Sequence, residues 1–470
     1  MNMLKRSMAL LMMLFIALSV FACAPAPAAE PAAPAATAAP APAAATAAPA
    51  PVEQGEGKVL NIYCWNTEFQ DRFNAYYASK VPSDVRVNFV INPNKDNVYQ
   101  NSLDEALLRQ ADAAADDKID IFLVEADYAL KYVNTDYTMD VINGVGLTKD
   151  DLAQQYKYTQ DIVTDSNGVL KATSWQATPG LFIYRRSIAK DVLGTYDPAQ
   201  VQEALSSWDK FDAVAAKAKD KGYFMLSGYD DAFRTFSNNI SQPWVDANNK
   251  IHLDDNMLRW VDQTKMYTEK GYNNKTTLWN PEWQADQGPK GKVFGFFYST
   301  WGVNFTLLGN SLEKPVAEGG KAEVGNGIYG DYAMCEGPQS YYWGGTWICA
   351  ATGTDNITLV RDIMKTLTCD AKTMKQITID TQDYTNNQAA MNELASSDVK
   401  FDFLGGQNHI AMFAQVAPKI SMTSMSPYDQ TMTEQLQKAC KDYFDGKVTK
   451  DQAIENFYTA VIEKHPELSK

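Results

Sequence analysis

Strands and amphipathic helices alternate between Val59 and Val124, and this alternation constrains the fold more than any other feature. Apolar runs at 59–65, 85–90 and 119–124 are typical of buried strands. The stretches between them repeat large apolar residues at helical spacing: Phe69, Phe73, Tyr76 and Tyr77 in the first, and Tyr99, Leu103, Ala106 and Leu107 in the second. A strand, a helix and a further strand need a crossover connection, which joins parallel neighbours. We therefore predict an α/β fold with a mainly parallel sheet.

Similar patterns continue to the C-terminus. Further strands are predicted at 181–184, 293–298 and 346–351. Helices are predicted at 207–219, 256–270, around 359–367, and near the end around 432–443 and 454–461. The globular part, about residues 58–470, is longer than one hydrophobic core usually holds, so we expect two domains.

The first residues have the pattern of an export signal. Lys5 and Arg6 precede an apolar run at 9–21, which is too short to span a bilayer as a mature helix. This run leads into a Val-Phe-Ala-Cys sequence, which resembles a bacterial lipobox, whose cysteine becomes diacylated after cleavage. We therefore predict a signal peptide at 1–22 and lipid attachment at Cys23.

A linker follows at 23–57. From Ala24 to Pro51 it is almost wholly Ala and Pro, a composition that gives an extended, semi-rigid spacer. We expect the body to lie outside the cytoplasm, on the outer face of the cell membrane, and to touch the membrane through the lipid anchor only. The alternative is ordinary secretion with cleavage near 26–28.

The charge of the chain excludes some partners. The full sequence has 42 basic and 57 acidic residues, and without the signal peptide 40 basic residues remain, a net charge of −17. An acidic chain repels nucleic acid and anionic lipid, so we expect no nucleic-acid partner. No second apolar run in the sequence is long enough to cross a membrane.

Common catalytic and metal-binding motifs are absent from the sequence. H-E-x-x-H, the Walker A loop and G-x-S-x-G do not occur, and the three histidines (His252, His409 and His465) are widely spaced. We therefore expect no metal, no cofactor and no enzyme activity. Two carboxylates can in principle hydrolyse a glycoside, but nothing in the sequence singles out a pair.

Aromatic residues stand beside polar ones where several predicted strands end. Such pairs suit a sugar, whose C–H faces stack on rings and whose hydroxyls bond to carboxylates, amides and guanidinium groups. Open α/β sheets bind ligands at the carboxyl ends of their strands. For any one tryptophan, packing in the core is the alternative. The candidate residues of this kind are Trp65, Asn66, Glu68, Glu125, Asp127, Trp175, Tyr229, Asp230, Asp231, Arg234, Trp301, Trp343 and Gly345.

Seven segments resemble, in the same order, the carbohydrate-type solute-binding lipoproteins of bacterial ABC importers, the extracellular family 1 group related to maltose-binding protein. Together they span essentially all of 58–470. The segments are KVLNIYCWNTEFQDRF, IDIFLVEADYALKYV, SWQATPGLFIYRRSIAK, FMLSGYDDAFRTFSNN, GKVFGFFYSTWGVNFTL, YYWGGTWICAATGTDN and FLGGQNHIAMF.

This resemblance implies a two-lobed, type II periplasmic-binding-protein-like α/β fold with a multi-strand hinge. By position, the expected lobes are 58–177 with 341–383 (lobe 1) and 178–340 with 384–470 (lobe 2). The expected crossings lie near Gln176–Pro179, Gly337–Trp343 and Asp383–Gln388. The resemblance also places Tyr428 at the cleft between the lobes. Its expected partners are a carbohydrate ligand and an ABC-transporter permease, and the protein is expected to be a monomer.

Three functions follow from these observations. The first is capture of a sugar, an oligosaccharide in preference to a monosaccharide, for delivery to a membrane importer. The second is binding of a polyamine or another cationic solute, because aromatic rings with carboxylates also hold ammonium groups; Arg234 argues against it, since a cation in the cleft repels such a ligand. The third is a surface-tethered glycoside hydrolase.

Overall fold

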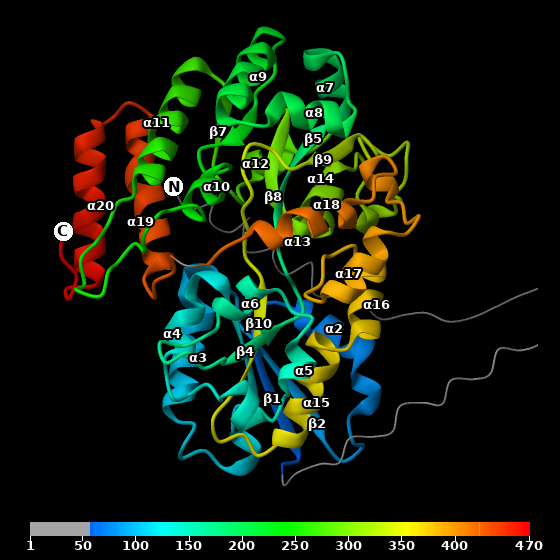
Figure 1. Cartoon of the computed structure of the whole chain (residues 1–470), viewed down its shortest axis with the longest axis vertical. Coiled ribbons are helices and arrows are strands. Elements are labelled where there is room, and N and C mark those ends of the chain that lie inside the picture. The colour runs from blue at the N-terminus through cyan, green and yellow to red at the C-terminus, as the bar shows by residue number, and fades with distance from the viewer. Residues whose placement is uncertain (1–56, 423) are drawn as a thin grey trace, which may run out of the picture. The chain divides into compact units, whose positions relative to one another are not determined.

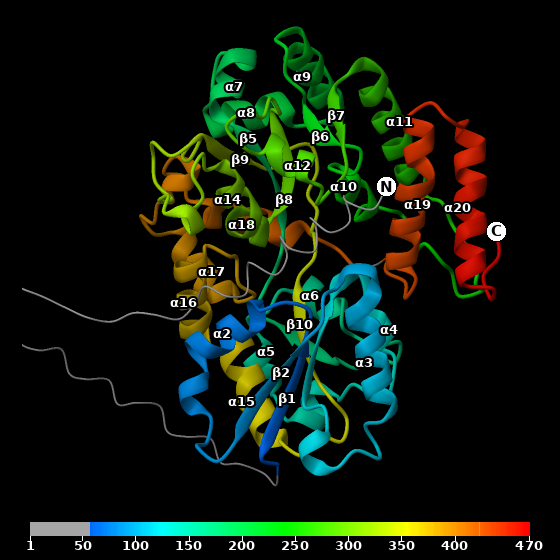
Figure 2. The same cartoon turned by 180° about the vertical axis from the view of Figure 1, so that it is seen from behind.

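A computed structural model describes residues 57–422 and 424–470. The predicted signal peptide at 1–22, the lipid attachment at Cys23 and nearly all of the linker lie outside the described residues. Figures 1 and 2 show the described part from opposite sides.

A five-stranded sheet forms the core of the part that we call lobe 1. Its strands, in spatial order, are β2 (Arg86–Ile91), β1 (Val59–Cys64), β3 (Ile121–Glu125), β10 (Thr346–Ala350) and β4 (Ala172–Ser174). β1 pairs in parallel with β2 and with β3, as the alternation of strands and helices predicts. β10 is antiparallel to both of its neighbours, because it enters the sheet from the other lobe and passes along β3 in the opposite direction.

Helices cover both faces of this sheet. α3 and α4 lie on one side, and α2 and α15 lie on the other (Figures 1 and 2). α15 carries the predicted apolar face, with Leu359, Ile363, Met364 and Leu367 all buried. The helices of this region are α2 (Glu68–Tyr76), α3 (Val98–Leu108), α4 (Ala129–Val133), α5 (Lys149–Leu152), α6 (Lys157–Asp161), α15 (Ile357–Thr368) and α16 (Ala371–Thr381).

Two smaller sheets form the core of lobe 2. The first has the order β8 (Gly295–Ser299), β5 (Gly180–Arg185), β9 (Tyr332–Cys335) and is antiparallel. The second pairs β6 (Leu226–Gly228) with β7 (Asn273–Thr276) in parallel. β5 and β8 confirm the strands predicted at 181–184 and 293–298. β4, β6, β7 and β9 were not predicted, because these strands are too short to show a clear pattern in the sequence.

Helices surround these sheets and complete lobe 2. They are α7 (Arg186–Leu193), α8 (Pro198–Leu205), α9 (Trp208–Asp220), α10 (Phe233–Ser237), α11 (Asp255–Lys270), α12 (Pro281–Asp286), α13 (Thr300–Gly302), α14 (Leu308–Ser311), α17 (Gln388–Ala395), α18 (His409–Val416), α19 (Asp429–Phe444) and α20 (Lys450–Lys464). The two C-terminal helices lie beside α11 at one edge in both views (Figures 1 and 2).

Three segments connect the lobes and are joined by backbone hydrogen bonds. Ala177 N donates to Tyr384 O at 3.1 Å, and Gly180 N donates to Tyr341 O at 2.7 Å. Trp343 N also donates to Thr178 O, at 3.1 Å. These contacts fall within or next to the crossings predicted from the resemblance. The lobe boundaries given above stay predictions.

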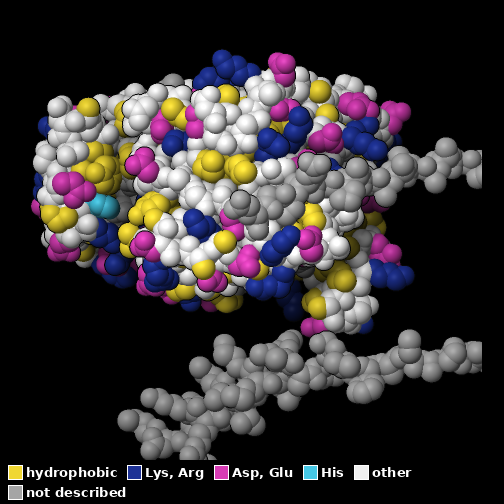
Figure 3. Space-filling view, turned by 90° about the horizontal axis from the view of Figure 1, so that it is seen from below, with side chains coloured by type: hydrophobic (Ala, Val, Ile, Leu, Met, Phe, Trp, Pro, Cys, Tyr) yellow, Lys and Arg dark blue, Asp and Glu magenta, His cyan; other side chains and the backbone are white. Residues whose placement is uncertain are grey.

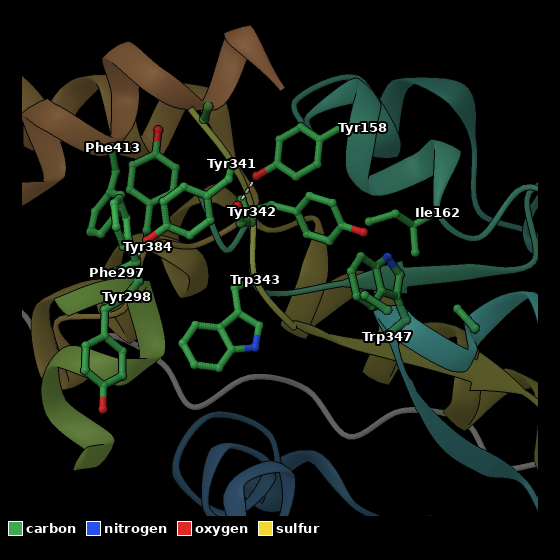
Figure 4. Close-up of a cluster of buried hydrophobic side chains, with 14 of the residues drawn as sticks. Tyr158, Ile162, Phe297, Tyr298, Tyr341, Tyr342, Trp343, Trp347, Tyr384 and Phe413 are labelled. Atoms are coloured by element: carbon green, nitrogen blue, oxygen red, sulfur yellow. Dashed lines mark hydrogen bonds between the residues drawn. The ribbon is translucent and has the colours of Figure 1, made fainter. Parts of the chain in front are cut away.

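Aromatic side chains pack around these connections. Tyr341, Tyr342 and Trp343 follow one another in sequence and point to different sides of their segment (Figure 4). The Tyr341 hydroxyl donates to Tyr298 O at 2.7 Å, and the Tyr158 hydroxyl donates to the carbonyl oxygen of Ala177. The connections are therefore held by packed rings as well as by the backbone.

Charges of both signs are interspersed on the face that Figure 3 shows. No helix within 57–422 and 424–470 is long and apolar enough to cross a membrane.

Candidate functional site

A cavity of about 820 Å³ lies between the lobes, and residues of both lobes line it. The carboxyl ends of β1 and β3 open on it, as predicted from the rule for α/β sheets. The predicted site residues that line this cleft are Trp65, Asn66, Glu68, Glu125, Asp127, Asp230, Asp231, Arg234, Trp301, Trp343 and Gly345.

Trp175 lies elsewhere, so its predicted role at the cleft is wrong. Its side chain is 1% exposed and stacks on Phe69, with ring centroids 5.6 Å apart. The Arg72 guanidinium lies 5.6 Å from the centre of the Trp175 ring. Trp175 belongs to the core of lobe 1 because the segment 174–176 turns its neighbour Gln176, and not the tryptophan, toward the cleft.

Tyr229 and Tyr428 are likewise outside the cleft lining, which corrects two further predictions. Tyr229 is buried, stacks on Phe444 at 5.8 Å, and donates its hydroxyl to Asp445 at 2.7 Å. Tyr428 packs edge-on against His465, with ring centroids 5.0 Å apart. Both tyrosines pack against the C-terminal helix pair, which short-range sequence patterns do not place.

In lobe 1, the loops after β1 and β3 position the cleft residues. Trp65 packs edge-on against Tyr99 and Tyr128, at centroid distances of 5.5 and 6.4 Å, so its ring is supported from behind. Glu125 ends β3 and caps the following helical turn, η4 (Ala126–Tyr128), by accepting from Asp127 N at 2.7 Å. These contacts fix the direction of both side chains.

A buried polar network joins α2 to the interlobe connections. Arg72 donates to Glu68 at 2.9 Å and to Asp383 at 3.2 Å. Gln176 donates to the same two carboxylates, at 2.9 Å each. Thr300 of lobe 2 donates to the second oxygen of Asp383 at 2.6 Å. Burial raises the pKa of Glu68, and the Arg72 charge opposes that effect.

Arg234 and Asp127 form an ion pair across the cleft. Nη1 of Arg234, on α10, donates to Oδ1 of Asp127 at 2.6 Å, and Nη2 donates to Oδ2. Burial lowers the pKa of Arg234, but the neighbouring Asp127 carboxylate outweighs that effect and raises it. The pair is bidentate, which is the strong geometry for a guanidinium and a carboxylate.

Three further carboxyl groups of the cleft have raised pKa values. Burial, with the neighbouring Asp127 charge, raises the pKa of Glu125 to about 8. Burial, with the Asp231 charge, raises the pKa of Asp230 to about 7. Burial also raises the pKa of Asp231 to about 6, although it accepts from the backbone of Ser227 and Gly228. Near neutral pH, Glu125 and Asp230 can therefore donate hydrogen bonds as well as accept them.

Aromatic rings, most of them from lobe 2, form one wall of the cleft. Trp301 is the second residue after β8, and its Nε1 donates to the carbonyl oxygen of Trp343 at 2.9 Å. The Trp343 ring lies edge-on to it, with centroids 5.1 Å apart. Trp279 stacks on Trp301 at 5.9 Å with an interplanar angle of 21°, and Phe305 is edge-on at 6.3 Å. The four rings are therefore linked by direct contacts along this wall.

Several residues of this lining were not predicted from the sequence. Trp279 and Phe305 gave no signal, because neither stands at the end of a predicted strand. Asp383 meets Arg72 across 311 positions of sequence, which no local pattern can reveal. The other residues of the lining that were not predicted as ligand contacts include Asp71, Asn94, Tyr128, Gln176, Phe233, Thr277, Leu278, Asn304, Gly344, Thr346, Thr381, Gln430, Thr433, Glu434 and Gln437.

The arrangement suits an uncharged, amphipathic ligand with flat faces. Rings offer apolar faces, and Asn66, Gln176, Glu125, Asp230 and the ion pair offer donors and acceptors around them. No group of three or more His, Cys, Asp or Glu side chains in the described part of the chain is placed to hold a metal ion.

Neither a protein-family model nor a curated protein matches the sequence. Solved structures do match. A structure described as an extracellular solute-binding protein of family 1 has a TM-score of 0.69 and 16% identity, over 86% of this chain and 99% of that chain. This structure and those described next share most of both lobes with the chain. The chain has the fold of these solute-binding proteins.

Two further matches were solved with bound sugars. The binding protein associated with an ABC transporter of B. animalis subsp. lactis Bl-04, in complex with β-1,6-galactobiose, has a TM-score of 0.64 and 15% identity, over 88% of this chain and 99% of that chain. The galacto-N-biose-/lacto-N-biose I-binding protein of the ABC transporter from Bifidobacterium longum, in complex with lacto-N-biose, has a TM-score of 0.64 and 11% identity, over 88% and 97%. The predicted two-lobed α/β fold is thus confirmed.

Proposed function

We propose that this chain is an extracytoplasmic solute-binding lipoprotein that captures a carbohydrate, in particular an oligosaccharide, between its two lobes. The observation that carries this proposal is the Trp301 ring at the cleft wall, which lines the same cavity as the Arg234–Asp127 pair and Glu125. A pyranose needs a flat apolar face beside planar hydrogen-bonding groups. The sugar complexes among proteins of the same fold support this choice of ligand.

The proposal includes delivery of the sugar to an ABC importer. Closure of the lobes buries the ligand, and the permease recognises the closed form. The proposed location is the outer face of the cell membrane, with the signal peptide at 1–22, the lipid on Cys23 and the spacer at 23–57. The protein acts as a monomer and not as an enzyme.

One observation favours a cationic solute as the second candidate. Both guanidinium groups of the cleft are already paired, Arg234 with Asp127 and Arg72 with Glu68 and Asp383. The cleft lining therefore has more carboxyl groups than cations that are free to repel a positively charged ligand. An ammonium group next to the aromatic wall is the corresponding ligand.

Calorimetric titration separates these candidates. The purified protein is titrated with glucose, galactose, maltose, β-1,6-galactobiose, lacto-N-biose and spermidine at one pH and ionic strength. Binding of a saccharide with no binding of spermidine supports the proposal. Binding of spermidine alone establishes the cationic alternative and overturns the proposal.

The same samples test the glycoside hydrolase. A disaccharide that binds is incubated with the protein for a day, and the solution is analysed for monosaccharide. Unchanged disaccharide supports a binding protein. Release of monosaccharide that stops on substitution of Glu125 or Asp230 identifies an enzyme.

A further inference from the structure

Trp279 has a backbone conformation that tryptophan rarely adopts. Asn280 N donates to Thr277 O at 3.2 Å, which closes a four-residue turn between β7 and α12. Trp279 is the third residue of this turn, and its φ of +70° is in the left-handed region. A positive φ at this position belongs to type II turns, where glycine or asparagine is normal. A bulky side chain there strains the backbone.

Packing in the core does not explain this strain. The Trp279 side chain is 48% exposed, and it lines the interlobe cleft. Its ring stacks on Trp301 and lies 6.1 Å from the Trp343 centroid and 5.4 Å from the Trp283 centroid. Only part of its apolar surface is removed from water by these contacts. A strained and exposed aromatic residue at a cleft indicates a role in binding.

Phe305 extends the same surface on a different segment. It is 68% exposed, lines the cleft, and lies in the π-helical turn η6 (Val303–Leu307) that follows Trp301. Such turns are frequent at functional sites. Trp301 therefore contacts two exposed rings that come from different segments, so the wall offers apolar surface beyond the Trp301 ring itself.

We propose that Trp279 forms a second sugar subsite, next to that of Trp301, and selects for ligands of two or more linked sugar units. This inference rests on the proposed function, because it concerns the length of the carbohydrate. The sugar unit nearest Trp301 is held by the polar groups of the cleft, and the next unit contacts the free surface of Trp279.

Trp279→Gly is the direct test, because glycine adopts the positive φ without strain. The wild type and the variant are titrated with glucose, maltose, maltotriose and maltotetraose, and with galactose and β-1,6-galactobiose. For the series that binds, we expect wild-type affinity to rise from one unit to two. The variant should lose on the order of 10-fold for the longer sugars and little for the monosaccharide. Its melting temperature should be unchanged or higher.

Two further variants serve as controls. Trp279→Tyr keeps an aromatic ring and should retain most of the affinity for longer sugars. Asn249→Gly changes another residue of positive φ, 60°, in a hairpin turn away from the cleft lining, and should leave all affinities unchanged.

Each failure has its own signature. If the wild type binds no saccharide, the proposed function and this inference both fall. If the wild type binds sugars and Trp279→Gly binds every length equally well, the inference alone is overturned. A large drop in the melting temperature of Trp279→Gly would show that this ring stabilises the fold, and would also overturn the inference.

Discussion

Arg234 and Asp127 lie on opposite lobes, and two hydrogen bonds join their side chains. The Nη1–Oδ1 distance is 2.6 Å, and each side chain is only 17% exposed. Arg234 belongs to α10 of lobe 2, whereas Asp127 follows β3 of lobe 1. The pair can form only when these two elements are close, so it stabilises the arrangement in which the cleft is narrow.

Asp127→Asn should therefore favour separation of the lobes. Removing one partner of a largely buried pair leaves the Arg234 charge without compensation, which costs up to about 3–5 kcal/mol. Opening exposes this charge to water and relieves the cost, so the opening equilibrium should shift by tenfold or more. Small-angle scattering of the ligand-free variant should give a larger radius of gyration than the wild type gives.

Asp104→Asn is the matched control for this experiment. Asp104 pairs with Lys131 within lobe 1 at 2.7 Å, and both side chains are well exposed. Its loss should leave the radius of gyration unchanged, because exposed pairs contribute little. Equal radii for Asp127→Asn and the wild type would show that the interlobe pair does not control opening.

Glu125 should make the protein less stable as the pH rises. Burial raises its pKa from 4.5 to about 8, so between these values the folded protein binds this proton and the unfolded chain does not. Its contribution to stability is full below about pH 4.5 and is lost as the pH rises through about 8. Glu125→Gln removes this titration.

Melting temperatures at pH 5 and pH 8.5 test this. Between these two pH values, the melting temperature of the wild type should fall by more than that of Glu125→Gln. All other titrating groups are shared, so the difference between the two falls is due to Glu125. If the two proteins change in parallel, Glu125 is already ionised in the folded protein at pH 5.

Trp301→Ala should weaken sugar binding while sparing the fold. The ring is half-buried at the cleft wall, so its loss removes a stacking contact worth roughly 1–3 kcal/mol, or about 5–150-fold in affinity. Trp175→Ala is the comparison, because Trp175 is fully buried and its loss should cost about 3–5 kcal/mol of stability. Titration and thermal melting of both variants should show that Trp301→Ala loses sugar affinity and keeps its stability, whereas Trp175→Ala loses stability. A strong loss of stability in Trp301→Ala would place this ring in the core.

The strand ends of the cleft could be predicted from the sequence, but the directions of their side chains could not. Apolar runs located β1, β3 and β8, and the polar and aromatic residues directly after them reach the cleft. Trp175 follows a strand in the same way and yet faces the core. Neighbouring residues point to opposite sides of an extended segment, and only tertiary packing decides which side is buried.

Contacts between segments that lie far apart in the sequence could not be predicted either. The antiparallel entry of β10 depends on a segment that returns from lobe 2. The position of Trp279 depends on a strained turn, for which sequence preferences predict glycine. Local rules failed at these two places because a long-range strand pairing and a strained turn depend on the tertiary structure.

Gly180→Ala should disrupt the connection between the lobes. A Cβ atom at this position would overlap Cε2 and Cζ of the Tyr341 ring. That ring cannot move easily, because its hydroxyl donates to Leu181 O at 3.0 Å and to Tyr298 O at 2.7 Å. Overpacking of this kind typically costs 1–3 kcal/mol, about a few degrees in melting temperature for a chain of this size.

The double variant Gly180→Ala/Tyr341→Leu distinguishes overlap from other effects of the substitution. Leucine lacks the part of the ring that the new Cβ meets, so Gly180→Ala should cost less stability in the Tyr341→Leu background than in the wild type. Thermal melting of the four proteins gives this coupling directly. Additive losses would mean that Tyr341 does not confine position 180, and that the glycine is needed there for another reason.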